Sequence, residues 1–396
     1  MSRVLIEVLP NIQACNMYIT LPPDTTCQKI LVDKSECSVE LQDGNIVCLK
    51  IPRGTYLVPN SVTGITQVSN IITARAQISE MTSLITALGG NILNDGDTKF
   101  LDTELNTSLS GSLVSARCKK CLTYVFSNVK FRRVMPLPSV DWDHSSEDWF
   151  CHLHAEHGNK LKPTSLQPNP DECFYTELFF LVHSNLLECM NAECDDSIVK
   201  CSKCRVLLGE KANLSVKVWT LSLEWVTQQD ETIYNRNSAE ILISLFHNID
   251  KDNFGVNCRL VLQAQTNPNK YLYMVTMNMN QKLLVSDISE FASCETMLQE
   301  SYGYREGMHC NSSKKLCLEK RKDISLKKIY AIKLLYLVKK GEDSQTGEWV
   351  DDINVHIIPC SISLLDEVKT MLEKSTYFLP DNVKTIENMN LGYIIK

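Results

Sequence analysis

The chain begins with short apolar runs that are rich in β-branched residues and separated by turn signals, at residues 3–9, 29–32, 38–41 and 46–51. Runs of this kind are typical of strands. Asp43-Gly44 separates the last two runs, and this dipeptide is a strong signal for a tight hairpin. Residues 65–78 alternate imperfectly, which fits one long strand or a bent pair. We therefore predict an antiparallel β sandwich or barrel as a β-rich N-terminal domain over residues 1–135.

Residues 136–172 break this pattern with five prolines and a long polar stretch, which predicts a connector. Connectors of that length often carry function. The connector contains an acidic, aromatic block that includes Asp141, Trp142, Asp143, Trp149 and Phe150. Aromatic side chains supply binding energy at interfaces, and carboxylates steer toward a basic partner. The block is therefore either a partner-binding segment or a solvated loop anchored by its two tryptophans.

Helical periodicity appears in the last part of the chain. Asp171 follows a proline and is a good N-cap, and the apolar positions after it predict a helix as far as residue 187. A second helix is predicted at residues 239–248. A third, at residues 361–374, is amphipathic, with its apolar residues at helical spacing.

Strands are predicted between these helices at residues 214–226, 256–266 and 272–277. Residues 325–338 are apolar and β-branched, and their state is ambiguous. The mixture predicts an α+β C-terminal domain over residues 173–396. The expected fold class is thus α+β and β-rich, with the N-terminal sandwich or barrel packed on a mixed α/β half.

Composition and charge narrow the class of protein. The chain has 396 residues, 44% of them hydrophobic, and a net charge of −7, which excludes a largely disordered chain and argues against general nucleic-acid binding. Arg3 and Glu7 interrupt the first apolar stretch, so it lacks the core of a signal peptide, and no apolar run is long enough to span a bilayer. We expect a cytoplasmic protein, with the nucleus as a second location, that binds neither membranes nor nucleic acid directly.

The most specific local signal is a pair of Cys-x-x-Cys units among 17 cysteines. Cys118 and Cys121 flank two lysines, and Cys201 and Cys204 flank Ser-Lys. Without export, a disulfide framework is not expected. Four thiolates suit tetrahedral zinc, and lysines offset part of the negative charge. We predict one structural zinc ion that clips the N-terminal β region to the C-terminal half.

Three alternatives to a tetrathiolate zinc stay open. One pair could be a redox site, although a thioredoxin-like site needs a single motif in a βαβ context. The pairs could also be coincidental in a cysteine-rich chain. Mixed ligation is the third alternative, because His152, His154 and His157 follow Cys151 closely. These histidines also suggest a zinc-dependent enzyme as a competing function.

Two other cysteines are candidates for chemistry. Cys360 lies between an apolar strand-like run and the predicted helix at residues 361–374, where a helix dipole favours a thiolate. On a strand, His356 would share its face and could serve as a base. Cys151 is the alternative, in a connector beside three histidines. Cys360 has an equally plausible structural role as a packed strand-end residue, and Cys151 could instead be a surface thiol or a metal ligand.

Four features occur together: the N-terminal β region, the paired Cys-x-x-Cys units, the stretch PLPSVDWDHSSEDWFCHLH, and the segment INVHIIPCSISLLDEVKTMLEKSTYFLP. This combination resembles the HECT-like ubiquitin ligases that bind a ubiquitin-conjugating enzyme, over nearly the whole chain. The resemblance implies transfer of ubiquitin to the ligase itself or to substrates such as a mitotic cyclin.

Two mechanisms are compatible with this resemblance. In the first, a thiolate at Cys360, with His356 as helper, takes ubiquitin from the conjugating enzyme as a thioester. In the second, the chain only positions the charged enzyme, through the acidic, aromatic block or the helix at residues 239–248. The wider family also suggests an alternative function as a non-catalytic binding protein or chaperone for an mRNA 3′-end processing factor.

Overall fold

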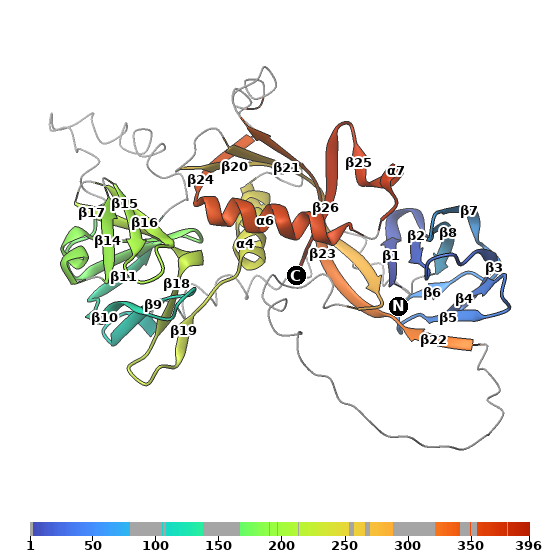
Figure 1. Cartoon of the computed structure of the whole chain (residues 1–396), viewed down its shortest axis with the longest axis horizontal. Coiled ribbons are helices and arrows are strands. Elements are labelled where there is room, and N and C mark those ends of the chain that lie inside the picture. Colours follow the sequence, from blue (N-terminus) through green and yellow to red (C-terminus); the bar gives the residue numbers. More distant parts are fainter. Residues whose placement is uncertain are drawn as a thin grey trace. The chain divides into compact units, whose positions relative to one another are not determined.

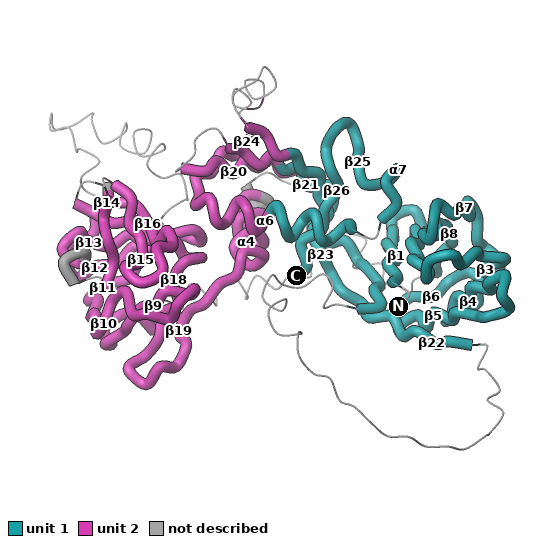
Figure 2. Tube along the Cα trace, in the orientation of Figure 1, with its two compact units in different colours: residues 1–90, 274–337, 369–396 teal, residues 91–273, 338–368 magenta. Residues whose placement is uncertain are grey.

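The computed structural model describes residues 3–79, 105, 108–137, 167–189, 191–195, 197–212, 214–252, 257–265, 270–287, 321–340, 349, 355–377 and 379–396 (Figure 1). The chain forms two compact units, each built from separate stretches (Figure 2). Unit 1 comprises residues 1–90, 274–337 and 369–396, and unit 2 comprises residues 91–273 and 338–368. The linear domain boundaries expected from the sequence stay a prediction.

The described elements of unit 1 are β1 (Arg3–Leu9), η1 (Pro10–Ile12), β2 (Ala14–Thr20), β3 (Cys27–Asp33), β4 (Glu36–Leu41), β5 (Ile46–Lys50), β6 (Tyr56–Leu57), β7 (Thr63–Val68), β8 (Ile71–Ser79), β22 (Arg321–Ser325), α7 (Asp381–Lys384), β25 (Thr385–Ile386) and β26 (Met389–Ile395). Three elements contain residues of both units: β21 (Lys270–Val285), β23 (Lys327–Lys340) and α6 (Ile362–Ser375).

Unit 1 is built mainly from two sheets. In the larger, the strand order runs β25-β26-β23-β21-β1-β2-β8-β6, and the smaller has the order β22-β5-β4-β3. Both faces of β1 are buried: Val4 and Ile6 enter one apolar cluster shared with the smaller sheet, and Leu5 enters another with β23 and β26. Because both faces exclude water, β1 is a nearly continuous apolar run, and this signal made the strand predictable.

A buried carboxylate interrupts that apolar strand. Glu7 is 1% exposed. Its Oε1 atom lies 2.5 Å from the Lys333 ammonium and accepts a hydrogen bond from the Tyr393 hydroxyl at 2.9 Å. The Asn16 amide donates to Oε2 at 3.4 Å. This network joins β1, β2, β23 and β26, and it gives the buried charge both a counter-ion and hydrogen bonds.

The described elements of unit 2 are β9 (Leu113–Cys118), β10 (Tyr124–Lys130), β11 (Arg133–Pro136), β12 (Glu172–Tyr175), β13 (Phe179–His183), η4 (Ser184–Cys189), β14 (Ala192–Asp195), β15 (Ile198–Cys201), β16 (Leu207–Ala212), β17 (Ser215–Trp219), η5 (Thr220–Ser222), β18 (Leu223–Val226), β19 (Thr232–Tyr234), α4 (Ser238–Asp252), β20 (Arg259–Ala264) and β24 (Val355–Cys360). One sheet has the order β10-β9-β18-β19, and another has the order β11-β12-β13-β17-β16-β15-β14. Residues of both sheets share one apolar cluster, in which Phe126, Phe180 and Trp225 pack ring against ring.

Two sequence predictions in this region are wrong. The helix expected after Asp171 is instead the antiparallel pair β12 and β13. Their residues are buried in unbroken runs of four, so the strands are covered on both faces, and such runs mimic the apolar face of a helix. The single strand expected at residues 214–226 is two strands in different sheets, separated by η5.

Several other predictions are confirmed. The hairpin across Asp43-Gly44 is the antiparallel pair β4 and β5, and the helices at residues 239–248 and 361–374 correspond to α4 and α6. The ambiguous residues 325–338 lie mainly in β23. The molecule is β-rich, with several sheets and few helices in its described parts. The predicted sandwich or barrel is not confirmed, because no sheet formed by the described strands closes on itself.

Candidate metal centre

The two cysteine pairs lie in turns with the same backbone structure, which we call the first knuckle (residues 118–121) and the second knuckle (residues 201–204). The first knuckle connects β9 to β10, and the second connects β15 to β16. In the first, the Leu122 N–H donates to the carbonyl oxygen of the leading cysteine at 2.8 Å. In the second, the Arg205 N–H makes the equivalent bond at 2.9 Å. The equal spacing of the two motifs therefore produces equal local geometry.

The residue after each knuckle has a left-handed backbone. Leu122 has a φ of 58° and Arg205 a φ of 61°. Glycine adopts this conformation without steric cost, whereas other residues are strained in it. Neither position is glycine, yet both turns adopt the conformation that glycine would favour.

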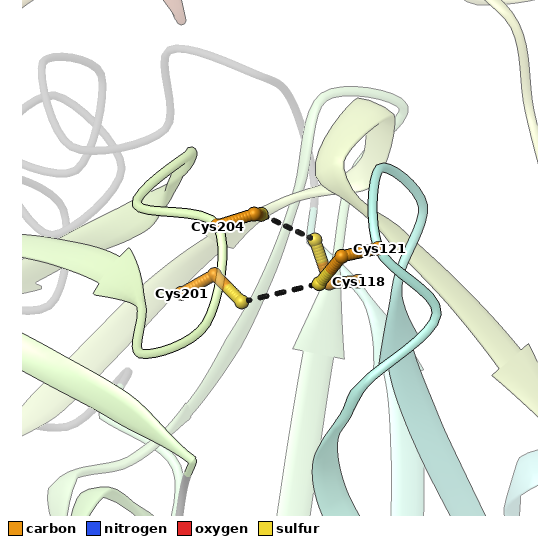
Figure 3. Close-up of side chains that lie close together, drawn as sticks. All are labelled: Cys118, Cys121, Cys201 and Cys204. Atoms are coloured by element: carbon orange, nitrogen blue, oxygen red, sulfur yellow. Dashed lines mark hydrogen bonds between the residues drawn. The ribbon is translucent and has the colours of Figure 1, made fainter.

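The two knuckles bring four sulfur atoms together, all within 4.8 Å of one another (Figure 3). The Sγ atoms of Cys118 and Cys204 are 3.6 Å apart, and those of Cys121 and Cys201 are also 3.6 Å apart. Four thiolates held tetrahedrally at about 2.3 Å from a zinc ion would lie about 3.8 Å apart. The donor set and its spacing therefore fit one tetrahedral metal ion.

This geometry tests two of the three alternatives that the sequence left open. It argues against coincidental pairs, because each short sulfur contact joins one knuckle to the other. The same contacts disfavour a redox motif, which would use the two cysteines of one knuckle. Among the described residues this is the one group of three or more potential ligands close enough to hold a metal. His152, His154 and His157 lie outside the described residues, so mixed ligation through them stays a prediction.

The thiols differ in their electrostatic surroundings. Burial raises the pKa of the Cys118 thiol to about 12 and also raises the pKa of Cys201. Cys121 is partly exposed, and a hydrogen bond with the Thr123 hydroxyl, at 3.4 Å, lowers its pKa to about 6. A bound divalent cation supplies the positive charge that four neighbouring thiolates require.

Two polar residues each connect one knuckle to the strand that follows the other knuckle, independently of the sulfurs. The Ser222 carbonyl accepts a hydrogen bond from the Lys119 N–H at 3.1 Å, and its hydroxyl donates to the Leu207 carbonyl at 2.8 Å. Asn191 donates through its side chain to the Tyr124 carbonyl, and its own carbonyl accepts from Ser202. Sequence reasoning missed these residues, because a serine or asparagine carries no spacing signal for such a bridge.

All four cysteines belong to unit 2. The centre therefore joins the sheet that contains β9 to the sheet that contains β15, both within one unit. This corrects the expected clip between an N-terminal and a C-terminal half. The first knuckle is N-terminal in sequence but packs with the second around the same apolar cluster, which includes Cys118 and Cys201.

Cys360 lies in a different environment. It is the last residue of β24, which pairs in parallel with β20, and its side chain is fully buried. Burial raises the pKa of this thiol to about 12. The hydroxyl of Ser361 accepts a hydrogen bond from the Leu364 N–H at 3.2 Å and thus caps α6. Desolvation therefore outweighs the helix dipole that favoured a thiolate at this position.

The other predicted site residues do not form a cluster with Cys360. His356 lies four residues earlier on the same extended strand, about 13 Å away, which is too far for direct proton transfer. Cys151 and the acidic, aromatic block with Asp141, Trp142, Asp143, Trp149 and Phe150 lie outside the described residues. In α4 the apolar residues are buried, so that face is already occupied. The catalytic and partner-binding roles of all these residues stay predictions.

The fold and the centre together describe a β-rich protein with a four-cysteine site of metal-binding geometry. The chain belongs to the HECT-like ubiquitin-conjugating enzyme (E2)-binding family, whose model matches residues 7–391.

Relatives that match over their full length share a common name. The chain is similar to proteins named as an E3 ubiquitin-protein ligase from mouse (21% identical, 99% of this chain and 98% of that protein), human (21%, with 99% and 98% covered) and cattle (17%, with 99% and 98% covered). No solved structure matches the chain. None of the helices in the described regions is long and apolar enough to cross a bilayer.

Proposed function

We propose that this chain is a ubiquitin-protein ligase that binds a ubiquitin-conjugating enzyme and promotes transfer of ubiquitin to itself or to substrates. The observation that carries the proposal is the family match, which extends through both compact units. The full-length similarity to proteins named as an E3 ubiquitin-protein ligase supports it. Ubiquitin itself as a partner, a mitotic cyclin as a target, and an RNA-processing factor as a binding partner stay predictions.

The cofactor that we propose is one structural zinc ion. It would be held by the four sulfurs of Cys118, Cys121, Cys201 and Cys204, with no open position for substrate. Closed tetrathiolate sites of this kind stabilise folds and do not perform chemistry. The zinc would therefore support the ligase by fixing the two sheets of unit 2.

For the transfer step we propose direct attack on the charged conjugating enzyme. The amine of a substrate lysine attacks the thioester carbonyl carbon, an isopeptide bond forms, and the thiolate of the conjugating enzyme leaves; the lysine nitrogen loses one proton. What supports this route is the burial of Cys360 and the raised pKa of its thiol. The alternative thioester at Cys360 requires the junction of β24 and α6 to open.

Mass spectrometry after incubation with ubiquitin-charged conjugating enzyme tests the proposal. We expect ubiquitin on lysine, resistant to reducing agent, at similar yield in wild type and Cys360→Ala. Cys37→Ala is the matched control, because Cys37 is also a fully buried strand cysteine. A reducible adduct lost only in Cys360→Ala would establish the thioester route instead, and one lost only in Cys151→Ser would assign it to Cys151. Failure of the wild-type chain to bind or discharge any conjugating enzyme would contradict the ligase function.

A further inference from the structure

We infer that the exposed residues in and directly after the two knuckles, Leu122 first among them, form the docking surface for the ubiquitin-conjugating enzyme. This inference rests on the proposed function and names the surface that performs it. The surface consists of Leu122, Lys120, Lys203 and Arg205, which all follow or lie between the cysteines. The four sulfurs are within 4.8 Å of one another, so the two knuckles are neighbours in unit 2.

Leu122 is unfavourable for stability in two respects. Its side chain is 59% exposed, so a large apolar group faces water. Its backbone has a φ of 58°, a conformation in which leucine is strained and glycine or asparagine is not. The turn itself requires the left-handed backbone, as the matching φ of Arg205 shows, but it does not require leucine at this position. The exposed apolar side chain therefore points to a role outside the fold. An apolar contact with a partner would be such a role, because binding would bury the leucine side chain.

The charges around Leu122 describe the partner. Lys120 and Lys203 are exposed, and Arg205 is exposed and ion-paired with Glu193. The whole chain carries a net charge of −7, so this basic cluster differs in sign from the average surface. Lysines beside a tetrathiolate offset its charge, but that effect does not call for an exposed leucine directly after the knuckle. The combination fits a protein surface with an apolar recess bordered by carboxylates.

We assign the conjugating enzyme to this surface because the family is described as binding that enzyme. An exposed aliphatic side chain favours a protein over a nucleic acid, because phosphate contacts use cations and polar groups. A metal bound by both turns would hold them rigid, and a rigid surface loses little entropy when it binds. The centre would then have two roles, holding two sheets together and presenting Leu122 in a fixed position.

Binding of the full, zinc-loaded chain to recombinant ubiquitin-charged conjugating enzymes tests the inference by titration calorimetry. Leu122→Asn keeps a residue that tolerates the left-handed backbone and removes the apolar contact. We expect at least tenfold weaker binding, while the thermal midpoint stays the same or rises. The charge variants Lys120→Glu and Lys203→Glu should weaken binding less and reduce its salt dependence.

Leu214→Asn is the matched control. Leu214 is also 59% exposed in unit 2, but its backbone is not left-handed and it lies away from the knuckles in sequence. Its affinity should equal that of wild type. Unchanged affinity of Leu122→Asn would overturn the inference and leave the ligase function intact. A wild-type chain that binds no conjugating enzyme would instead remove the proposed function itself.

Discussion

Two polar clusters join distant parts of the chain, one in each unit. In unit 2 the knuckles bring Cys118 to within 3.6 Å of Cys204. In unit 1 Glu7 receives a hydrogen bond from Tyr393, 386 residues away, and pairs with Lys333. The first cluster is made of one kind of group, and as four thiolates it would need a cation from outside the chain. The second contains its own counter-ion and donors, so it is complete within the protein.

This difference predicts which unit would depend on a cofactor. Four close thiolates repel one another, and without a metal the buried ones must stay protonated. A carboxylate with an ammonium and a phenol at hydrogen-bond distance is stable as it stands. We therefore expect chelators to act on unit 2 and to leave unit 1 nearly unaffected, and the predictions below test that division in order of decreasing effect.

Loss of the metal should have the largest effect. Cys201→Ser leaves three sulfurs around a position that needs four, so we expect loss of one equivalent of zinc and destabilisation of unit 2 by about 3–5 kcal/mol. Metal analysis and calorimetry measure both quantities. Cys194→Ser is the control, because Cys194 is an exposed cysteine on neighbouring β14. A Cys201→Ser chain with full zinc content would contradict the tetrathiolate assignment.

Removal of the Glu7 charge should have an intermediate effect. Glu7→Gln leaves the Lys333 ammonium without its counter-ion in a site where the lysine side chain is only 16% exposed. Breaking such a pair on one side costs about 3 kcal/mol. The double variant Glu7→Gln with Lys333→Met should recover part of this loss, since no unpaired charge remains. Chemical denaturation with and without a chelator measures the stability of each unit. Equal destabilisation of both units by the chelator would contradict the proposed difference between them.

The sequence predicted the first cluster and missed the second for a physical reason. A knuckle requires two cysteines at fixed spacing, so the motif is local and visible. Glu7 lies within an apolar strand, and the two partners of its Oε1 atom, Lys333 and Tyr393, come from strands more than 300 residues away. Only the packed sheet brings these groups together, and nothing in the sequence near Glu7 indicates it.

The same distinction separates the predictions that were confirmed from those that were wrong. Helix α6 was predictable because its apolar residues recur at helical spacing. The helix after Asp171 was not, because β12 and β13 are buried on both faces and lose the alternation that marks a strand. Cys360 looked reactive from its neighbours in sequence, but reactivity depends on burial, which is a property of the whole fold.

The smallest effect should come from Ser222, which links the first knuckle to β16. Ser222→Ala removes the hydroxyl that donates to the Leu207 carbonyl at 2.8 Å, a loss of about 1 kcal/mol. The backbone bond from Lys119 to the Ser222 carbonyl persists in the variant, so the two turns should stay aligned and zinc content should not change. A denaturation midpoint shifted by the loss of the hydrogen bond, with an unchanged slope, and an unchanged zinc content would confirm this expectation. Loss of zinc in Ser222→Ala would mean that the hydroxyl bridge, and not the four sulfurs, sets the alignment of the knuckles, and the centre would then depend on the fold as much as the fold depends on the centre.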